Sequence, residues 1–351
     1  MAISMATSMV ITKFISLLAM RGIAAFTIAL GVNIALGLLA PSVHAQAQAP
    51  AASVWPTKPV KFVVPFPAGS PPDYAIRSIT ERLASRWGQP VLVENRPGAS
   101  GIIGVNTALQ APADGHTFLF AQGSALSIVP RTVKGVQFDY KRDFVPVALA
   151  AIAPIVLAVR ADDELNKFED LIALAKAQPE KIDMGNPGKA TIPHLAAEVI
   201  GLNAKVKFYP IYFQGGPAAV AALLGKNIRV VVDGYGAVQS QVAAGKLKVL
   251  AVMADQVYPG LEAFALTTRV VPDTAVMGWF GVYARKGTEE AVVTKVNADM
   301  NAALNSPDIV AKFREIGTYI KSGPPAALDA FTVSEQKFWA EKLEALGIKP
   351  E

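Results

Sequence analysis

The 351-residue sequence contains no cysteine and only three histidines. The lack of cysteine excludes disulfide bonds, zinc–thiolate sites, iron–sulfur clusters and a thiol nucleophile. Charged residues are also scarce, at 17% of the chain against 52% hydrophobic residues. This balance is far from that of a disordered chain and provides apolar material for a large core, with length for two domains.

The excess of positive charge is small. Of the 33 lysine and arginine residues, Lys13 and Arg21 lie in a segment that we expect to be removed, so 31 remain against 28 acidic residues, a net charge of +3. A domain that binds nucleic acid usually carries a much stronger basic excess. We therefore predict no nucleic-acid partner.

An uncharged apolar run at residues 22–40 follows Lys13 and Arg21 and ends at Pro41 and the small-residue site V-H-A, residues 43–45. This arrangement is typical of a secretory signal peptide. The alternative is an uncleaved membrane anchor, but Asn33 and the A-x-A-like site favour cleavage. We predict a signal peptide at residues 1–45, with a start codon later than Met1 left open.

The segment that follows, residues 46–54, is rich in Ala, Gln and Pro and is predicted to be a flexible tether. The folded part then begins near Trp55. Its export predicts a periplasmic protein if the source is a Gram-negative bacterium.

The first folded segment alternates between predicted strands and helices. A β-branched run at residues 60–66 leads through a turn-rich loop into a helix in which Ile76, Ile79, Leu83 and Trp87 recur at helical spacing before Gly88. Further strands are predicted at residues 90–96 and 116–121, with a helix between them. This alternation predicts a parallel sheet with helices on both faces.

A second α/β unit follows, with an apolar strand region at 145–160 that we expect to be broken at Pro154. Another strand is predicted at 277–285, and the chain beyond it is mostly helical. These helices need a sheet to pack on, and we expect them to return to the first domain through crossings near Pro154 and Gly278. The predicted domains are residues 55–154 plus 278–351, and residues 155–277.

In open parallel sheets, ligands bind beyond the carboxyl ends of the strands, near helix N-termini. Loops rich in Gly, Pro or polar residues follow the predicted strands at 65–73, 122–124, 185–194 and 212–217, and Asp233 ends another strand. Each loop taken alone is better explained as a simple turn than as a ligand loop. Together they predict a ligand site.

Several motifs carry a resemblance to a known family. They are WPTKPVKFVVPFPAG at 55–69, GQPVLVENRPGASGIIG at 88–104, ADGHT at 113–117, PHLAAE at 193–198 and AGKLKVLAV at 244–252. In this order and spacing the chain resembles the Bug family of extracytoplasmic solute receptors, the substrate-binding proteins of tripartite tricarboxylate transporters. The resemblance implies an α/β fold of two Rossmann-like domains joined by two crossover segments, the Venus-flytrap architecture, with a small carboxylate in the cleft.

The chain departs from the family pattern in the predicted ligand loops. Ala68, Ser70, Pro71 and Pro72 replace a proline, two glycines and a threonine of the family motif, which leaves only Pro67, Gly69 and Asp73. Ile192 stands where a hydroxyl residue usually caps the helix, Phe213 replaces a lysine, and Lys189 lies in a loop that is commonly neutral.

These changes predict an aromatic or medium-chain carboxylic acid as the ligand, with Lys189 facing either the cleft or solvent. The predicted ligand-binding residues are Phe66, Pro67, Ala68, Gly69, Ser70, Asp73, Gln122, Ser124, Asn186, Lys189, Thr191, Ile192, His194, Tyr212, Phe213 and Asp233.

An enzyme is disfavoured. There is no G-x-S-x-G elbow, and the mature chain has only His116 and His194 as candidate bases, for both of which a structural role outweighs catalysis. The segment at 98–104 has the wrong spacing for a dinucleotide fingerprint, and no phosphate loop or metal motif is present. We predict a monomeric receptor without cofactor or metal that serves transporter subunits in the membrane. An orphan receptor for a sensor kinase and, less favoured, a secreted hydrolase remain alternatives.

Overall fold

The computed structural model describes residues 55–351. The predicted signal peptide, residues 1–45, and tether, residues 46–54, lie outside the described residues. Within residues 55–351, no helix is both long enough and apolar enough to cross a membrane.

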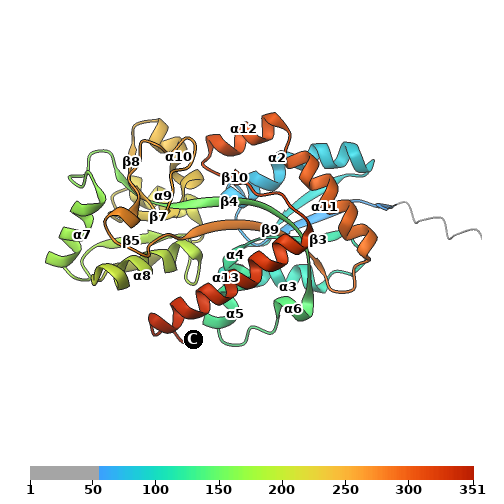
Figure 1. Cartoon of the computed structure of the whole chain (residues 1–351), viewed down its shortest axis with the longest axis horizontal. Coiled ribbons are helices and arrows are strands. Elements are labelled where there is room, and N and C mark those ends of the chain that lie inside the picture. The colour runs from blue at the N-terminus through green and yellow to red at the C-terminus, as the bar shows by residue number, and fades with distance from the viewer. Residues whose placement is uncertain (1–54) are drawn as a thin grey trace, which may run out of the picture. The chain divides into compact units, whose positions relative to one another are not determined.

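Ten strands of residues 55–351 form one curled sheet, in which eight follow the order β2-β1-β3-β9-β4-β7-β5-β6 while β8 and β10 each pair with β4 beside it (Figure 1). The strands are β1 (Val60–Val64), β2 (Val91–Asn95), β3 (Thr117–Gln122), β4 (Phe144–Arg160), β5 (Asp183–Asn186), β6 (Tyr209–Tyr212), β7 (Val230–Gly234), β8 (Leu247–Val252), β9 (Met277–Arg285) and β10 (Tyr319–Ile320).

Helices lie between most of the strands. They are α2 (Pro71–Trp87), α3 (Ile102–Gln110), α4 (Gly123–Ser127), α5 (Val129–Thr132), α6 (Tyr140–Asp143), α7 (Phe168–Ala177), α8 (Ile192–Ala204), α9 (Gly216–Leu224), α10 (Tyr235–Ala243), α11 (Glu290–Leu304), α12 (Pro307–Glu315) and α13 (Pro325–Ala345), with short 3-10 turns η1 (Ala99–Gly101) and η2 (Thr267–Arg269).

The first strand group consists of β1, β2, β3, β9 and β10 with the first part of β4. Strands β2, β1 and β3 pair in parallel, as the alternation of strands and helices predicts. The next neighbour, β9, runs antiparallel to both β3 and β4. The predicted parallel sheet is therefore correct only for β1 to β3, because the chain that returns from the second half enters this sheet in the opposite direction.

The second strand group consists of β5, β6, β7 and β8 with the last part of β4. Strand β5 pairs in parallel with β6 and β7, whereas β4 pairs antiparallel with β7 and β8. Both groups thus combine parallel strands, connected through helices, with antiparallel pairing to β4.

Strand β4 belongs to both groups and continues unbroken from Phe144 to Arg160, so the predicted break at Pro154 is wrong. Pro154 is the last β4 residue that pairs with β9, opposite Met277, and Ile155 is the first that pairs with β7, opposite Gly234. Proline has no N–H to donate to a sheet partner. Its position at the exchange of partners lets the strand pass without losing a ladder bond.

Helix α2 shows how the sequence sets a local element. Ile76, Ile79, Leu83 and Trp87 repeat at helical spacing, and all four are buried against the sheet. The helix ends at Gly88, which has a φ of 64° and donates its N–H to the carbonyl of Ala84. The predicted face and end of this helix are confirmed.

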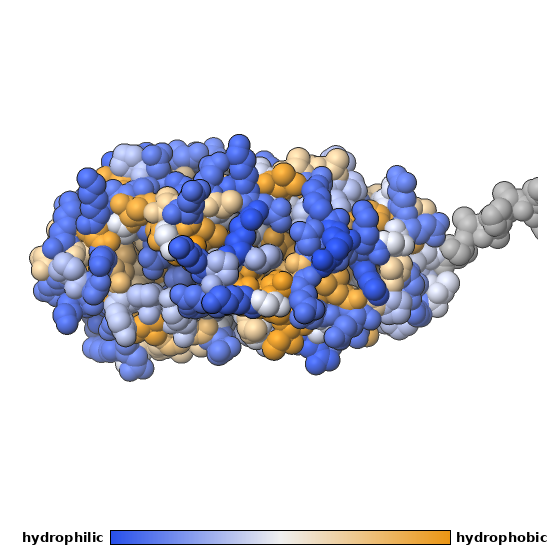
Figure 2. All heavy atoms as spheres, turned by 90° about the horizontal axis from the view of Figure 1, so that it is seen from below, coloured by the Kyte–Doolittle hydropathy of each residue, from blue (hydrophilic) through white to orange (hydrophobic). Residues whose placement is uncertain are grey.

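The helices after β9 pack on elements of the first strand group. Helix α11 contacts α2 and β4, α12 contacts α2 and β10, and α13 contacts β4 and α4. One hydrophobic cluster contains residues of both groups, among them Leu119 and Trp279 with Leu157 and Leu195. The face that carries α5, α8 and the end of α13 is mostly covered by hydrophilic side chains, with separate apolar areas between them (Figure 2).

Candidate functional site

A cavity of about 220 Å³ lies among four loops, each at the carboxyl end of a strand. The loops after β1 and β2 come from the first strand group, and those after β5 and β6 come from the second. We call this space the interloop cavity. Its lining residues are Pro65, Phe66, Pro67, Pro97, Gly98, Ala99, Ser100, Gly101, Pro187, Gly188, Lys189, Thr191, Tyr212, Phe213, Gln214 and Gly215.

The loop after β2 has an unusual backbone. Residues 98–101 all have positive φ, including the non-glycine residues Ala99 (46°) and Ser100 (54°). Such conformations cost energy in residues with a Cβ atom and concentrate at binding sites. The Ser100 hydroxyl donates a hydrogen bond of 2.6 Å to the carbonyl oxygen of Lys189, which connects this loop to the loop after β5.

The loop after β5 is held by side-chain hydrogen bonds. Asn186 Oδ1 accepts from the N–H of Gly188 at 3.3 Å. Thr191 Oγ1 accepts from the N–H of His194 at 3.4 Å and donates to the carbonyl of Gly188 at 2.7 Å. Thr191 is therefore the N-cap of α8.

Ile192 is the first residue of α8 and is almost completely buried in the hydrophobic core. The capping hydroxyl that the family pattern usually has at position 192 is supplied here by Thr191, one residue earlier. Because Ile192 packs inward, it lines neither this cavity nor the neighbouring one described next.

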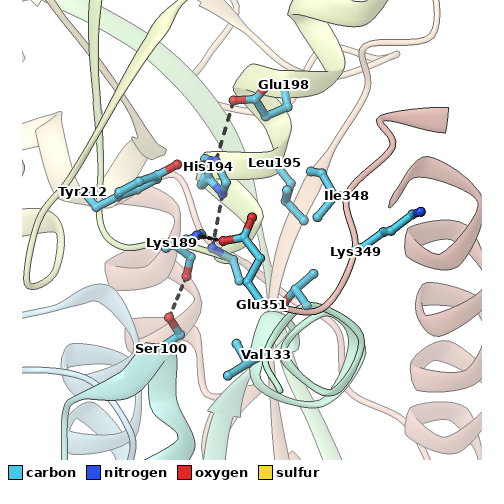
Figure 3. A pocket seen from close by; sticks show the side chains of 12 residues that line it. Ser100, Val133, Lys189, His194, Leu195, Glu198, Tyr212, Ile348, Lys349 and Glu351 are labelled. Atoms are coloured by element: carbon cyan, nitrogen blue, oxygen red, sulfur yellow. Dashed lines mark hydrogen bonds and ion pairs between the residues drawn. The ribbon is translucent and has the colours of Figure 1, made fainter. Parts of the chain in front are cut away.

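A second cavity of about 420 Å³ adjoins the first and is here called the tail cavity. Ser100, Lys189 and Tyr212 line both cavities. The tail cavity is further lined by Thr132, Val133, Ala190, His194, Leu195, Glu198, Ile348, Lys349 and Glu351. Figure 3 shows the Lys189 ammonium beside the Glu351 carboxylate, with which it forms an ion pair. This carboxylate raises the pKa of Lys189.

His194 has hydrogen-bonding neighbours at both ring nitrogens. The N–H of Ala190 lies 3.2 Å from Nδ1, which must accept because a backbone amide can only donate. The proton of the neutral ring is then on Nε2, which lies 3.3 Å from the hydroxyl oxygen of Tyr212 and 3.7 Å from Glu198 Oε1. His194 therefore orients Tyr212, whose pKa is raised by burial.

In the loop after β1, Phe66 and Pro67 line the interloop cavity, whereas Ala68 and Gly69 are exposed outside it. Ser70 is buried, and its hydroxyl donates to the carbonyl of Pro67 at 2.6 Å. Asp73 accepts hydrogen bonds from this loop and from neighbouring side chains. Ser70 and Asp73 thus hold the loop through hydrogen bonds and do not line the cavity themselves.

Gln122, Ser124, Asn186 and Asp233 line neither cavity. The buried Ser124 hydroxyl has no hydrogen-bond partner among residues 55–351. Asp233 accepts from the N–H of Gly234 at 2.7 Å, and burial raises its pKa to about 7. The predicted residues that line the interloop cavity are Phe66, Pro67, Lys189, Thr191, Tyr212 and Phe213, and those that line the tail cavity are Lys189, His194 and Tyr212.

The site prediction omitted residues of the loop after β2 and of the end of the chain. Residues 97–101 belong to the PGASG motif of the family resemblance, and their glycines signalled a special backbone. Ile348 and Glu351 carry no such signal, because only the fold brings them to Lys189, which is 162 positions before Glu351 in the sequence.

Comparison with known proteins assigns the chain to a protein family. The model of the tripartite tricarboxylate transporter family receptor, TctC, matches residues 75–347. The chain belongs to this family. The resemblance to Bug receptors is thereby confirmed, and the receptor is a solute-binding protein of the TctC/Bug type.

Individual relatives agree. A UPF0065 protein from the tcbD–tcbE intergenic region of Pseudomonas sp. strain P51 is 32% identical over 309 residues, 88% of this receptor and 90% of that protein. The BugT protein of Bordetella pertussis is 29% identical over 300 residues, 85% of this receptor and 92% of that protein.

Among solved structures, Rhodopseudomonas palustris Rpa4515 with adipate superposes with a TM-score of 0.82 at 28% identity, covering 85% of this receptor and 100% of that chain. The periplasmic binding protein BugD superposes with a TM-score of 0.79 at 28% identity, with the same coverage. The predicted fold class, a periplasmic-binding-protein architecture of the α/β type, is confirmed.

Proposed function

We propose that the receptor captures a small organic carboxylate in the interloop cavity and delivers it to the membrane subunits of a tripartite tricarboxylate transporter. The observation that supports this proposal most is that loops of both strand groups line the cavity. Two loops come from each strand group, so one molecule in the cavity touches both groups at once. Membership of the TctC family supports delivery to a transporter.

A negatively charged ligand suits the electrostatics of this cavity. Helix α8 begins at its wall, and the N-terminus of a helix attracts anions through its N–H groups and its dipole. Lys189 adds a mobile positive charge from the same loop, with its side chain 55% exposed. The relative Rpa4515 was solved with adipate, a dicarboxylate, which supports the same class of ligand.

The body of the ligand is predicted to be apolar. Phe66 from the first strand group and Phe213 from the second both line the cavity, and prolines from three of its loops add further carbon surface. Such walls enclose an aromatic ring or a short methylene chain more favourably than a ligand rich in hydroxyl groups. An aromatic or medium-chain acid therefore remains the proposed ligand.

The receptor is proposed to work in the periplasm, with residues 1–45 directing its export, and to release its ligand unchanged. The proposed lobes are residues 55–154 with 278–351 and residues 155–277, which would close on the ligand through β4 and β9. Each lobe supplies two of the four loops, so ligand contacts would favour the closed arrangement.

Native mass spectrometry of the receptor purified from its own periplasm tests the proposal. A co-purified organic acid, recovered with unchanged mass after denaturation, is the expected result. Calorimetry with adipate, benzoate and the corresponding neutral amides then defines the class. Preference for the amides, or conversion of the bound molecule, would contradict the proposed function.

A further inference from the structure

Lys189 stands in the wall between the interloop cavity and the tail cavity and lines both. Its side chain carries a single ammonium group, and that group is paired with the carboxylate of Glu351 in the tail cavity (Figure 3). A carboxylate ligand that uses this ammonium therefore meets a carboxylate of the protein already in contact with it.

The backbone around Lys189 is held by hydrogen bonds, whereas its side chain is held only by the ion pair with Glu351. The Lys189 carbonyl accepts from Ser100 Oγ at 2.6 Å, and the N–H of Ala190 donates to His194 Nδ1 at 3.2 Å. The side chain of Lys189 is 55% exposed and has four flexible methylene groups. The hydrogen bonds that hold the backbone do not restrict rotation about these side-chain bonds, and both cavities border the side chain.

Glu351 is also presented from a fixed backbone. Its N–H donates to the carbonyl of Thr132 at 3.1 Å, and its main-chain oxygen accepts from the N–H of Lys134 at 2.8 Å. Lys189 lowers the pKa of the Glu351 side chain, and Lys134 adds to this effect. When Lys189 turns away, Glu351 therefore keeps a second cation nearby and remains 74% exposed to water, so its release costs little.

We propose that the Lys189 ammonium is a carboxylate subsite shared between ligand and protein, and that Glu351 occupies it as an intramolecular competitor which the ligand's carboxylate displaces. This inference rests on the proposed function, because it requires a carboxylate ligand. It identifies Glu351 as a residue that sets the affinity threshold for anionic ligands.

The Glu351 carboxylate is expected to be a weak competitor, because both partners of its ion pair with Lys189 are exposed. An ion pair between two exposed side chains contributes little to stability, and a ligand carboxylate held by the loops as well as by Lys189 outcompetes it. Removal of the Glu351 charge is therefore expected to strengthen binding of an acid by about two- to fivefold, not by orders of magnitude. The affinity for neutral ligands should not change, because they do not compete for the Lys189 ammonium.

The test is isothermal calorimetry of the mature receptor with adipate, benzoate and adipamide. Glu351→Gln should bind the two acids about two- to fivefold more tightly and adipamide unchanged. Lys189→Met should weaken binding of the acids, and adding Glu351→Gln to it should then have no further effect. That loss of effect in the double variant shows that both residues act on one ammonium.

Two control variants separate this contact from a general change in charge. Glu344→Gln removes a negative charge from an exposed position of α13 and should leave all three affinities unchanged. Lys349→Met removes a cation that lines the tail cavity but points away from the Lys189–Glu351 pair in Figure 3, and it should also have no effect.

Unchanged or weaker binding of the acids by Glu351→Gln would overturn the proposed competition. If Glu351→Gln weakened binding of adipamide as much as binding of the acids, the ion pair would instead act as a latch between loops. Equal effects of Glu344→Gln and Glu351→Gln also overturn it, because they indicate long-range charge alone. If neither acid binds the wild type or any variant, the carboxylate-receptor function falls together with this inference.

Discussion

The carboxylate of Asp73 accepts a hydrogen bond of 2.9 Å from the backbone N–H of Gly69, across the turn that leads from β1 into α2. Its other oxygen accepts from Arg77 Nε at 2.8 Å and from Asn95 Nδ2 at 2.9 Å. The side chain is 6% exposed. Asp73 thus connects the loop after β1, the first turn of α2 and the end of β2.

Asp73→Ala is expected to lower the free energy of unfolding by about 2–4 kcal/mol, because it removes a buried acceptor and leaves three donors without it. Urea denaturation followed by circular dichroism measures the change. Asp308→Ala is the control, since Asp308 pairs with Arg82 at the surface and is 51% exposed. A similar loss of stability in both variants would contradict the role assigned to Asp73.

Gly215 lets the loop after β6 approach the loop after β1. It has a φ of 100°, and a Cβ atom there would lie 2.9 Å from Pro67 Cγ. Gly215→Ala should weaken binding of the acid by about 1–3 kcal/mol, because the two walls of the interloop cavity are forced apart.

Gly245→Ala is the matched control for this prediction. Gly245 also has a positive φ, 67°, but a Cβ atom there would meet nothing within 4 Å. Both variants should lose stability from backbone strain, by about 1 kcal/mol. Only Gly215→Ala should change the dissociation constant measured by calorimetry, and equal affinities would refute the contact argument.

Asp233 predicts a pH dependence of stability. Burial raises its pKa from 3.8 to about 7 in the folded state, against the opposing effect of the Gly234 N–H. Between these values the folded protein binds the proton more tightly than the unfolded chain. The contribution of protonated Asp233 to the free energy of unfolding is therefore complete below about pH 4. It declines as the pH rises toward 7, by at most about 4 kcal/mol.

Asp233→Asn should remove this decline. Urea midpoints at pH 4.5 and pH 7.5 are compared for the wild type and the variant, and the difference between the two pH values should be smaller in the variant. An identical pH dependence in both proteins would show that Asp233 does not titrate in this range.

Closure around the ligand predicts a smaller molecule in solution. Strand β4 belongs to both strand groups, the chain returns to the first group at the start of β9, and four loops from both groups meet at the interloop cavity. Small-angle scattering should give a shorter radius of gyration at saturating ligand. Superimposable scattering profiles with and without ligand would argue against closure.

The sequence predicted those elements whose residues carry a periodic pattern. The buried positions of α2, its end at Gly88 and the strand at Met277–Arg285 follow from apolar spacing and turn residues alone. The course of β4 through Pro154 did not, because proline usually ends a strand. Only the exchange of partners from Met277 to Gly234 makes it acceptable at this position.

The residues of the candidate site likewise include some that a local sequence pattern predicts and others that only the fold brings together. Lys189 and Tyr212 lie in loops after predicted strands, and the structure places both at the cavities. Ile192 was expected at the ligand because of its place in a motif, but it packs into the core, since Thr191 already caps the helix. Glu351 reaches Lys189 because backbone hydrogen bonds hold it to Thr132, the last residue of α5, and to Lys134, and no local pattern encodes these contacts.

The position of a bound acid tests the central claim most directly. We expect a crystal structure of the receptor with the acid that binds best in calorimetry to show its carboxylate oxygens within hydrogen-bond distance of the loops at residues 97–101 and 187–191. The body of the acid should lie between Phe66 and Phe213. An acid bound outside the interloop cavity, or in contact with loops of only one strand group, would contradict the account.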